Sequence, residues 1–215
     1  MKHMSNKLVL VGGGGHCASV IDTVLTSTEY EEIVITDKES VGKKLLGIPI
    51  VGTDDCLEKL FQKGFTDAFI TVGSIGDPNN RRRIYNQIKK IGFNVPNIID
   101  KTASVSKNVN LGEGIFIGKQ AVVNSLAEIG NNCIINTAAV IEHQCSLGEF
   151  VHVAPHAVLC GNTAVGDGSH IGAGSVIRQQ IKIGKNVTIG AGSVAVKNIA
   201  DGKTAYGNPC KEKEK

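Results

Sequence analysis

The stretch LGEGIFIGKQAVVNSLAEIG, residues 111–130, opens a run in which an aliphatic residue occupies every sixth position. The run continues without a break to Ala195, and Val105 and Ile99 extend the same register backwards. A period of six matches neither the 3.6-residue repeat of a helix nor the two-residue alternation of a single strand. It predicts coils of three short strands, stacked into a parallel β-solenoid with eighteen residues per coil.

Two further positions follow the same register. Gly comes directly after the aliphatic residue at eight of the fifteen positions from Leu111 to Ala195, which indicates a turn there, because Gly tolerates turn conformations. Two residues before the aliphatic position the side chain is usually small, which predicts a place near a corner of a triangular coil. Each buried aliphatic side chain contributes about 1.5–3 kcal/mol, so a column of coils is stable where one coil is not.

The residues before the repeat predict a separate α/β unit. We expect a Rossmann-like βαβαβ unit, with strands at residues 7–11, 33–35 and 68–72 and helices at residues 18–25 and 84–91. The predicted domains are therefore residues 1–97, a Rossmann-like α/β domain, and residues 98–215, the solenoid with a C-terminal tail.

A glycine run, Gly12–Gly15, joins the first strand to the first helix and is followed by His16. Backbone N–H groups that converge at a helix N-terminus suit a phosphate or diphosphate. Cys17 replaces the third glycine of the dinucleotide fingerprint, and three strands make half of a dinucleotide fold, which favours a nucleotide or nucleotide-sugar over NAD. Asp37, at the end of the second strand, is in place to hold a ribose; a tight turn without a ligand is the alternative.

Charge and composition exclude some functions. The formal charge is +3, Arg81–Arg83 is the one dense basic cluster, and the chain has no Trp, so nothing indicates nucleic-acid binding. The arginine cluster fits either a solvated helix start or a phosphate contact. No signal peptide or membrane-spanning stretch is visible, and the six Cys lack a CxxC pair, with Cys133 and Cys145 in inward positions. We therefore expect buried thiols and a cytoplasmic location.

The solenoid register brings candidate catalytic groups together. Positions eighteen apart stack at strand spacing, which places Gly161 directly over His143 and His170 over His152. A histidine beside a backbone N–H supplies the base and the oxyanion donor that acyl transfer needs. His156 and His170 are interpreted as surface residues. His152 and His156 could form part of a zinc site, but such sites usually have a third histidine and a different spacing, so no metal is expected.

The motif EHQCSLGEFVH at residues 142–152, with Asn136-Thr137 before it and Cys160-Gly161-Asn162 after it, resembles the bacterial sugar acetyltransferases of the PglD/NeuD type. The resemblance covers nearly the whole chain. It implies a left-handed parallel β-helix of hexapeptide repeats, acetyl-CoA as co-substrate, and a homotrimer with active sites between neighbouring helices. Members N-acetylate nucleotide-linked amino sugars, or O-acetylate sialic acids and polysaccharide sugars, in glycan biosynthesis.

The resemblance also implies roles for single residues. His143 matches the general base, with Gln144 beside it, and Gly161 matches the backbone N–H that holds the oxyanion. Three positions match acetyl-CoA contacts, namely His152 near the thioester and Ala173 and Ala191 along the pantetheine arm. Six positions match the nucleotide-sugar pocket: Gly14, Gly15, His16, Asp37, Lys38 and Gly73.

Three departures from the family pattern bear on specificity. Gln144 stands where an acidic residue is usual, and without a charge it stabilises an imidazolium less, which favours an amine over a hydroxyl acceptor. Lys38 replaces a common acidic residue and leaves the nucleobase open. The segment Gly73–Arg83 is longer than in close relatives, near the expected sugar pocket, so acceptor specificity can differ.

The leading interpretation is acetyl-CoA-dependent N-acetylation of a nucleotide-linked amino sugar. The first alternative is O-acetylation of a sialic acid or a surface polysaccharide sugar. A second alternative, from another class, is a non-catalytic trimer that binds a nucleotide-sugar. A metal-dependent hydratase is the most distant of the four.

Overall fold

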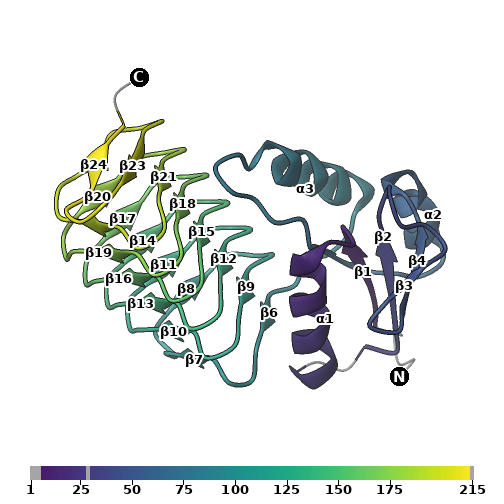
Figure 1. Cartoon of the computed structure of the whole chain (residues 1–215). Helices are drawn as coiled ribbons and strands as arrows, with labels where there is room; N and C mark the ends of the chain where they lie inside the picture. Colours follow the sequence, from purple (N-terminus) through teal and green to yellow (C-terminus); the bar gives the residue numbers. More distant parts are fainter. Residues whose placement is uncertain (1–5, 28–29, 214–215) are drawn as a thin grey trace. The chain divides into compact units, whose positions relative to one another are not determined.

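The structure is a computed structural model that describes residues 6–27 and 30–213 of the chain. It divides into two compact units, one of Met1–Gly73 with Asn79–Ile98, the other of Ser74–Pro78 with Ile99–Lys215 (Figure 1). The boundary near residue 98 falls within strand β6, and the short segment Ser74–Pro78 belongs to the second unit.

The first unit is a five-stranded sheet with helices. Its strands are β1 (Lys7–Val11), β2 (Glu32–Thr36), β3 (Lys44–Leu45), β4 (Ile48–Gly52) and β5 (Asp67–Ile70), in the order β3-β4-β2-β1-β5. Its helices are α1 (Gly15–Ser27), the short 3₁₀ turn η1 (Asp54–Cys56), α2 (Leu57–Gln62) and α3 (Asn79–Ile91). β1 pairs in parallel with both β2 and β5, so the carboxyl ends of these strands meet at one edge.

The three predicted strands are present, but the βαβαβ prediction was incomplete. It omitted the β3–β4 hairpin, η1 and α2, and both predicted helices start earlier than expected, α1 at Gly15 and α3 at Asn79. β3 has only two residues, and Pro49 in β4 argues against a strand when the sequence is taken alone. Pro49 is accommodated because it lies in the antiparallel hairpin opposite Lys44, while Ile50 pairs with β2.

The second unit is the predicted parallel β-helix, and its short strands form three faces. The first face holds β7 (Ser104–Val105), β10 (Val122–Val123), β13 (Val140–Ile141), β16 (Val158–Leu159), β19 (Val176–Ile177) and β22 (Val194–Ala195). The second face holds β8 (Asn110–Leu111), β11 (Glu128–Ile129), β14 (Ser146–Leu147), β17 (Ala164–Val165) and β20 (Lys182–Ile183). The third face holds β6 (Ile98–Ile99), β9 (Phe116–Ile117), β12 (Ile134–Ile135), β15 (His152–Val153), β18 (His170–Ile171), β21 (Thr188–Ile189), β23 (Thr204–Tyr206) and β24 (Lys211–Glu212).

The eighteen-residue register is confirmed on every face. Val122 pairs with Val140, and His152 pairs with His170. The aliphatic series and the small residues two positions earlier fill one continuous core, as at Ala139 and Ile141, both 0% exposed. This register therefore fixes which side chains stack along the outside of the helix.

The turns differ from the prediction in one respect. From Gly114 to Gly192 every sixth residue, three positions after the aliphatic one, has a positive φ, and Gln144 and Asn162 are among them. The glycines directly after the aliphatic positions do not. A Cβ at Gly148 would come within 2.8 Å of the Asp167 backbone nitrogen, so these glycines make room for the next coil. Within residues 6–27 and 30–213, no helix has the length and apolarity needed to span a membrane.

Candidate active site

His143 lies at the corner between the first and second faces, in the turn that joins β13 to β14. The Gln144 side-chain oxygen is 3.2 Å from His143 Nδ1, so Nδ1 donates to this amide and Nε2 keeps its lone pair. The backbone holds the turn in place, because Gln144 N–H donates to the Ser125 carbonyl and Asn162 N–H donates to the His143 carbonyl. The imidazole is exposed, with Nε2 in position to act as a base.

Gly161 lies one coil along from His143, at the same corner. A Cβ added at Gly161 would come within 2.6 Å of His143 Nε2, so only glycine leaves room for the ring. In the described part of the chain nothing accepts a hydrogen bond from the Gly161 N–H. An unused backbone donor thus lies beside the lone pair of a histidine, which is the arrangement expected for acyl transfer.

A cavity of about 380 Å³ opens at this corner. It is lined by polar groups and one thiol, from His143, Gln144, Cys160, Gly161, Asn162, Gln179 and Gln180. Five of these residues belong to the motif quoted from the sequence; Gln179 and Gln180 follow from the same register, because the corner repeats every eighteen residues.

His152 lies on the third face, away from the His143 corner, and stacks on His170 as predicted. The two ring centroids are 4.8 Å apart at an interplanar angle of 72°. The interpretation of His170 as a surface residue was wrong, because its side chain is only 8% exposed. Burial lowers the pKa of the His170 imidazole.

Ala173 and Ala191 lie at the corner between the third and first faces, one coil apart. The Gly192 N–H donates to the Ala173 carbonyl at 2.8 Å, which confirms the predicted stacking. Both alanines are exposed, and among the described residues nothing accepts from their own N–H groups. The corner therefore presents a short ladder of backbone donors to the solvent.

In the first unit, the glycine turn and Asp37 form one structure at the carboxyl edge of the sheet. Asp37 accepts hydrogen bonds from Gly13 N–H and Glu39 N–H, both at 2.8 Å. Burial acts to raise the pKa of this carboxyl, but the N–H groups of Gly13, Glu39 and Ser40 and the Lys38 ammonium outweigh it and keep the pKa below its usual value. A Cβ at Gly14 or Gly15 would meet nothing within 4 Å, so this side of the turn is open to a ligand.

The remaining residues predicted for the nucleotide pocket lie in different places. Gly73 lies beside His16, with a Cβ at Gly73 3.9 Å from the His16 Cβ. Lys38 extends into solvent and pairs with Glu39 at 3.7 Å. A pocket of about 410 Å³ adjoins Asp37 and Lys38.

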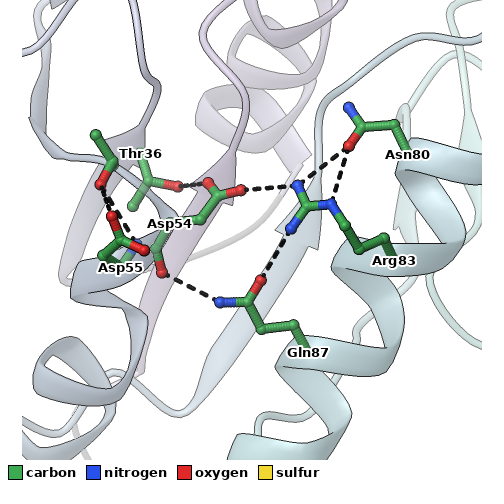
Figure 2. Close-up of polar contacts among 7 residues, drawn as sticks. Thr36, Asp54, Asp55, Asn80, Arg83 and Gln87 are labelled. Atoms are coloured by element: carbon green, nitrogen blue, oxygen red, sulfur yellow. Dashed lines mark hydrogen bonds and ion pairs between the residues drawn. The ribbon is translucent and has the colours of Figure 1, made fainter.

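The sequence prediction missed most residues that line this pocket. Thr36, Asp54 and Arg83 form its polar side: Thr36 Oγ1 donates to Asp54, and Arg83 pairs with Asp54 at 3.4 Å. Figure 2 shows the Arg83 guanidinium between Asp54, Asn80 and Gln87. Only long-range folding brings α3 to the residues after β4, so spacing along the chain carries no signal for this network.

The arginine cluster resolves into three different environments. It lies in the first turns of α3, as a helix start would, but Arg81 is 1% exposed, which contradicts a fully solvated cluster. Arg82 is half-buried, and only Arg83 reaches the pocket.

Among the described residues no group of three or more His, Cys, Asp or Glu side chains is arranged to hold a metal ion. All six cysteines are free thiols, and Cys133 and Cys145 are buried as predicted. Burial raises the pKa of the Cys145 thiol, which keeps it protonated beside the His143 turn.

Two family models match the chain: the PglD N-terminal domain over residues 7–88, and the bacterial transferase hexapeptide repeat over residues 162–195. Perosamine N-acetyltransferase from Caulobacter crescentus, solved with CoA and GDP-perosamine, is 33% identical with a TM-score of 0.93, and the match covers 98% of each chain. The acetyltransferase domain of PglB from Neisseria gonorrhoeae is 38% identical with a TM-score of 0.91, over 96% of this chain and 99% of that one. The same domain has also been solved with acetyl-CoA. No curated protein sequence matches the chain.

Proposed function

The chain belongs to the PglD/NeuD-type bacterial sugar acetyltransferases, with their Rossmann-like domain and left-handed β-helix, and we propose that it transfers the acetyl group of acetyl-CoA to the amino group of a nucleotide-linked amino sugar. The observation that carries this proposal is the His143 lone pair beside the unused Gly161 N–H. Two of the similar proteins have been solved with CoA or acetyl-CoA, and one of them also with a nucleotide-linked amino sugar.

In the proposed reaction the sugar amine attacks the carbonyl carbon of the acetyl thioester while His143 Nε2 accepts the proton that the amine loses. The carbonyl oxygen becomes an oxyanion and is stabilised by the Gly161 N–H. Collapse of this tetrahedral species breaks the C–S bond, and the thiolate of CoA leaves with the proton that His143 held. The products are the N-acetylated sugar and CoA thiol.

Gln144 supports an amine acceptor. Its amide oxygen orients the imidazole at 3.2 Å but adds no negative charge to stabilise an imidazolium. A neutral amine is a stronger nucleophile than a hydroxyl and asks less of its base. O-acetylation of a sialic acid or polysaccharide sugar is therefore the second candidate, and a trimer that only binds the nucleotide-sugar is the third.

The open glycine turn supports a nucleotide-sugar as the acceptor. Gly14 directly precedes α1 and Gly15 is its first residue, where N–H groups and the helix dipole favour a diphosphate. Asp37 fixes the turn from the side, so we assign the pocket that adjoins it to the nucleoside. The roles of His16, Lys38 and Gly73 in this pocket are part of the same proposal.

The placement of the two histidines supports a homotrimer. His143 lies at one edge of the first face, whereas His152 lies on the third face, beyond the corner of Ala173 and Ala191. Because the two histidines lie on different faces, we assign the complete site to two protomers, with His143 from one and His152, Ala173 and Ala191 from its neighbour. The N–H groups of the two alanines would then bind carbonyl oxygens of the pantetheine arm.

The first face also has the composition of an interface. Its outward side chains are a column of half-buried valines, Val122, Val140, Val158, Val176 and Val194. The second face carries mostly polar side chains in the same column, such as Glu128, Ser146 and Lys182. A half-buried apolar stripe of this kind is the surface that a second copy would cover. The six free thiols fit a reducing cytoplasm as the place of this reaction.

A thiol-release assay tests the proposed function. The wild-type protein is incubated with acetyl-CoA and one acceptor at a time: amino sugars linked to UDP, GDP or dTDP, free sialic acid, and a polysaccharide repeat. We expect CoA release only with a nucleotide-linked amino sugar. Release with sialic acid or the polysaccharide alone would support the O-acetyltransferase, and binding of a nucleotide-sugar without any release would support the non-catalytic trimer.

A further inference from the structure

The pocket of about 410 Å³ beside Asp37 combines aliphatic walls with a polar side. Val72 and Ile84 line it with aliphatic side chains, and Ile84 is only 2% exposed. On the polar side, Asp54 and Arg83 pair at 3.4 Å. Aliphatic side chains can pack on a flat heterocycle while a few polar groups bind its edge, so the polar side decides which nucleobase fits.

The guanidinium of Arg83 is held by hydrogen bonds to its neighbours, as Figure 2 shows. Nε and Nη2 donate to the Asn80 side-chain oxygen at 3.3 and 3.1 Å. Nη1 donates to Gln87 at 3.3 Å, and Nη2 also donates to Asp54 at 3.4 Å. Within the described part of the chain, these bonds leave one of the five guanidinium N–H groups for a ligand. Arginine usually binds a phosphate through two parallel N–H groups, so Arg83 is better placed to contact a base than a diphosphate.

Asp54 has spare capacity to accept hydrogen bonds. Thr36 Oγ1 donates to its Oδ1 at 3.2 Å, and Arg83 donates to its Oδ2 at 3.4 Å. Each oxygen of a carboxylate can accept about two hydrogen bonds, so each keeps room for one more. Asp55 adds a further carboxylate to the lining, and its Oδ2 accepts from Thr53 Oγ1 at 3.0 Å. The polar side therefore offers several acceptors and one donor.

The nucleobases differ in the groups that their edges present. Guanine presents an acceptor, O6, followed by two donors, N1–H and N2–H₂. Uracil and thymine present a single donor between two carbonyl oxygens, and cytosine presents a single amino donor beside two acceptors. Several acceptors beside one donor complement guanine, whereas a pyrimidine would turn one of its own acceptors towards a carboxylate and leave it unpaired.

We propose that this pocket selects guanine, so that the acceptor is a GDP-linked amino sugar, and that Asp54 is the specificity-determining residue. The Asp54 carboxylate accepts from N1–H and N2–H₂ through two parallel bonds, and the remaining Arg83 N–H donates to O6. Thr36 positions Asp54, while Asn80 and Gln87 position Arg83. This assignment rests on the proposed function, which leaves the nucleotide open.

Binding of plain nucleoside diphosphates tests the assignment without acetyl transfer. Isothermal titration calorimetry on the full-length protein compares GDP with UDP, dTDP, CDP and ADP, and also with IDP, which lacks only the N2 amino group of GDP. We expect GDP to bind most tightly and IDP to bind about tenfold more weakly, as the loss of a hydrogen bond to a charged group requires. Tighter binding of another nucleotide, or equal binding of GDP and IDP, would overturn the proposal.

Asp54→Asn should change the base preference in a predictable direction. The side-chain amide places a donor where the carboxylate accepted, which opposes guanine N2–H₂ but matches the C2 carbonyl of xanthine. We expect the variant to bind GDP at least tenfold more weakly than the wild type and to bind XDP more tightly than the wild type does. Glu58→Gln makes the same chemical change at an exposed position of α2 and should keep the affinities of the wild type. A preference for GDP over XDP that Asp54→Asn leaves unchanged would overturn the role of Asp54.

The outcomes separate this proposal from the proposed function. If Asp54→Asn does not fold, the comparison of GDP with IDP on the wild type still decides whether N2–H₂ is recognised. If another nucleotide binds best and its amino sugar is acetylated, the guanine assignment fails and the proposed function stands. If no nucleoside diphosphate binds, both fail.

Discussion

Gly161 lies so close to His143 that a single methyl group would collide with the imidazole, since a Cβ at this glycine would come within 2.6 Å of Nε2. The two residues are eighteen apart in sequence and one coil apart in space, with Asn162 N–H bonded to the His143 carbonyl. A proposed base and a proposed oxyanion donor are thus held in register by the backbone of the β-helix itself.

Gly161→Ala should reduce kcat strongly while the protein remains folded. The new methyl group must push the His143 ring away from its position, and a misplacement of about 1 Å costs on the order of 100-fold in rate. The measurement is kcat for CoA release, with thermal unfolding as the check on folding. Gly202→Ala is the stricter control, because it adds the same methyl group in open space but at a φ of 69°, where the backbone is the more strained of the two. Equal activity of the two variants would contradict the proposed role of Gly161.

Gln144→Glu should change the rate of amine acetylation little, by less than about threefold. The carboxylate keeps the hydrogen bond to His143 Nδ1 that the amide makes at 3.2 Å and adds only imidazolium stabilisation. A neutral amine needs little of that assistance, whereas a hydroxyl needs much more. Steady-state kinetics with the best amino-sugar acceptor will check this, and a large rate increase would argue for a hydroxyl as the natural acceptor.

Val158→Glu should dissociate the proposed trimer and lower activity more than tenfold. The substitution places a charge in the middle of the valine column on the first face, where a buried interface would leave it unpaired. Light scattering after size-exclusion chromatography gives the oligomeric state. Ser146→Glu, an exposed position on the second face, should remain trimeric and active. A trimeric Val158→Glu would move the interface to another face.

His170 should make stability depend on pH below neutrality. Burial lowers the pKa of this imidazole in the folded protein, so the unfolded chain binds more protons as the pH falls through the ordinary histidine range. The free energy of unfolding therefore keeps its full value above about pH 6.5 and decreases below it. One group can lower it by at most about 1.4 kcal/mol per pH unit. Urea unfolding between pH 5 and 7.5 should show a flatter slope for His170→Phe, and His156→Gln, at an exposed turn, should keep the slope of the wild type.

The β-helix could be predicted from the sequence because its register is local and unbroken. Counting in eighteens placed Gly161 on His143, His170 on His152 and Ala191 on Ala173, and the structure confirms all three. What a regular period cannot predict is a segment that returns from elsewhere in the chain. The contact of Ser74 with His152 and the contact of Arg83 with Asp54 both depend on folding over long sequence separations.

The burial of His170 and the turn glycines show a second limit. The outward position of His170 predicted exposure, but the residue is only 8% exposed, and Ser74 and Gly76 approach its column neighbours His152 and Thr188. The glycines after the aliphatic residues look like turn residues, whereas the positive φ angles fall two positions later, at residues such as Gln144 and Asn162. The repeat pattern shows that glycine is preferred at a position. Only the packed structure shows whether the reason is a positive φ angle or a lack of room for a Cβ atom.

The most direct test of the account is the rate of CoA release by His143→Ala with acetyl-CoA and the best nucleotide-linked amino sugar. General base catalysis by a positioned histidine contributes about 10²- to 10⁴-fold, so kcat should fall by that factor while the protein stays trimeric and still binds acetyl-CoA. A His143→Ala variant whose kcat stays within twofold of the wild type would contradict the assignment of His143 as the base.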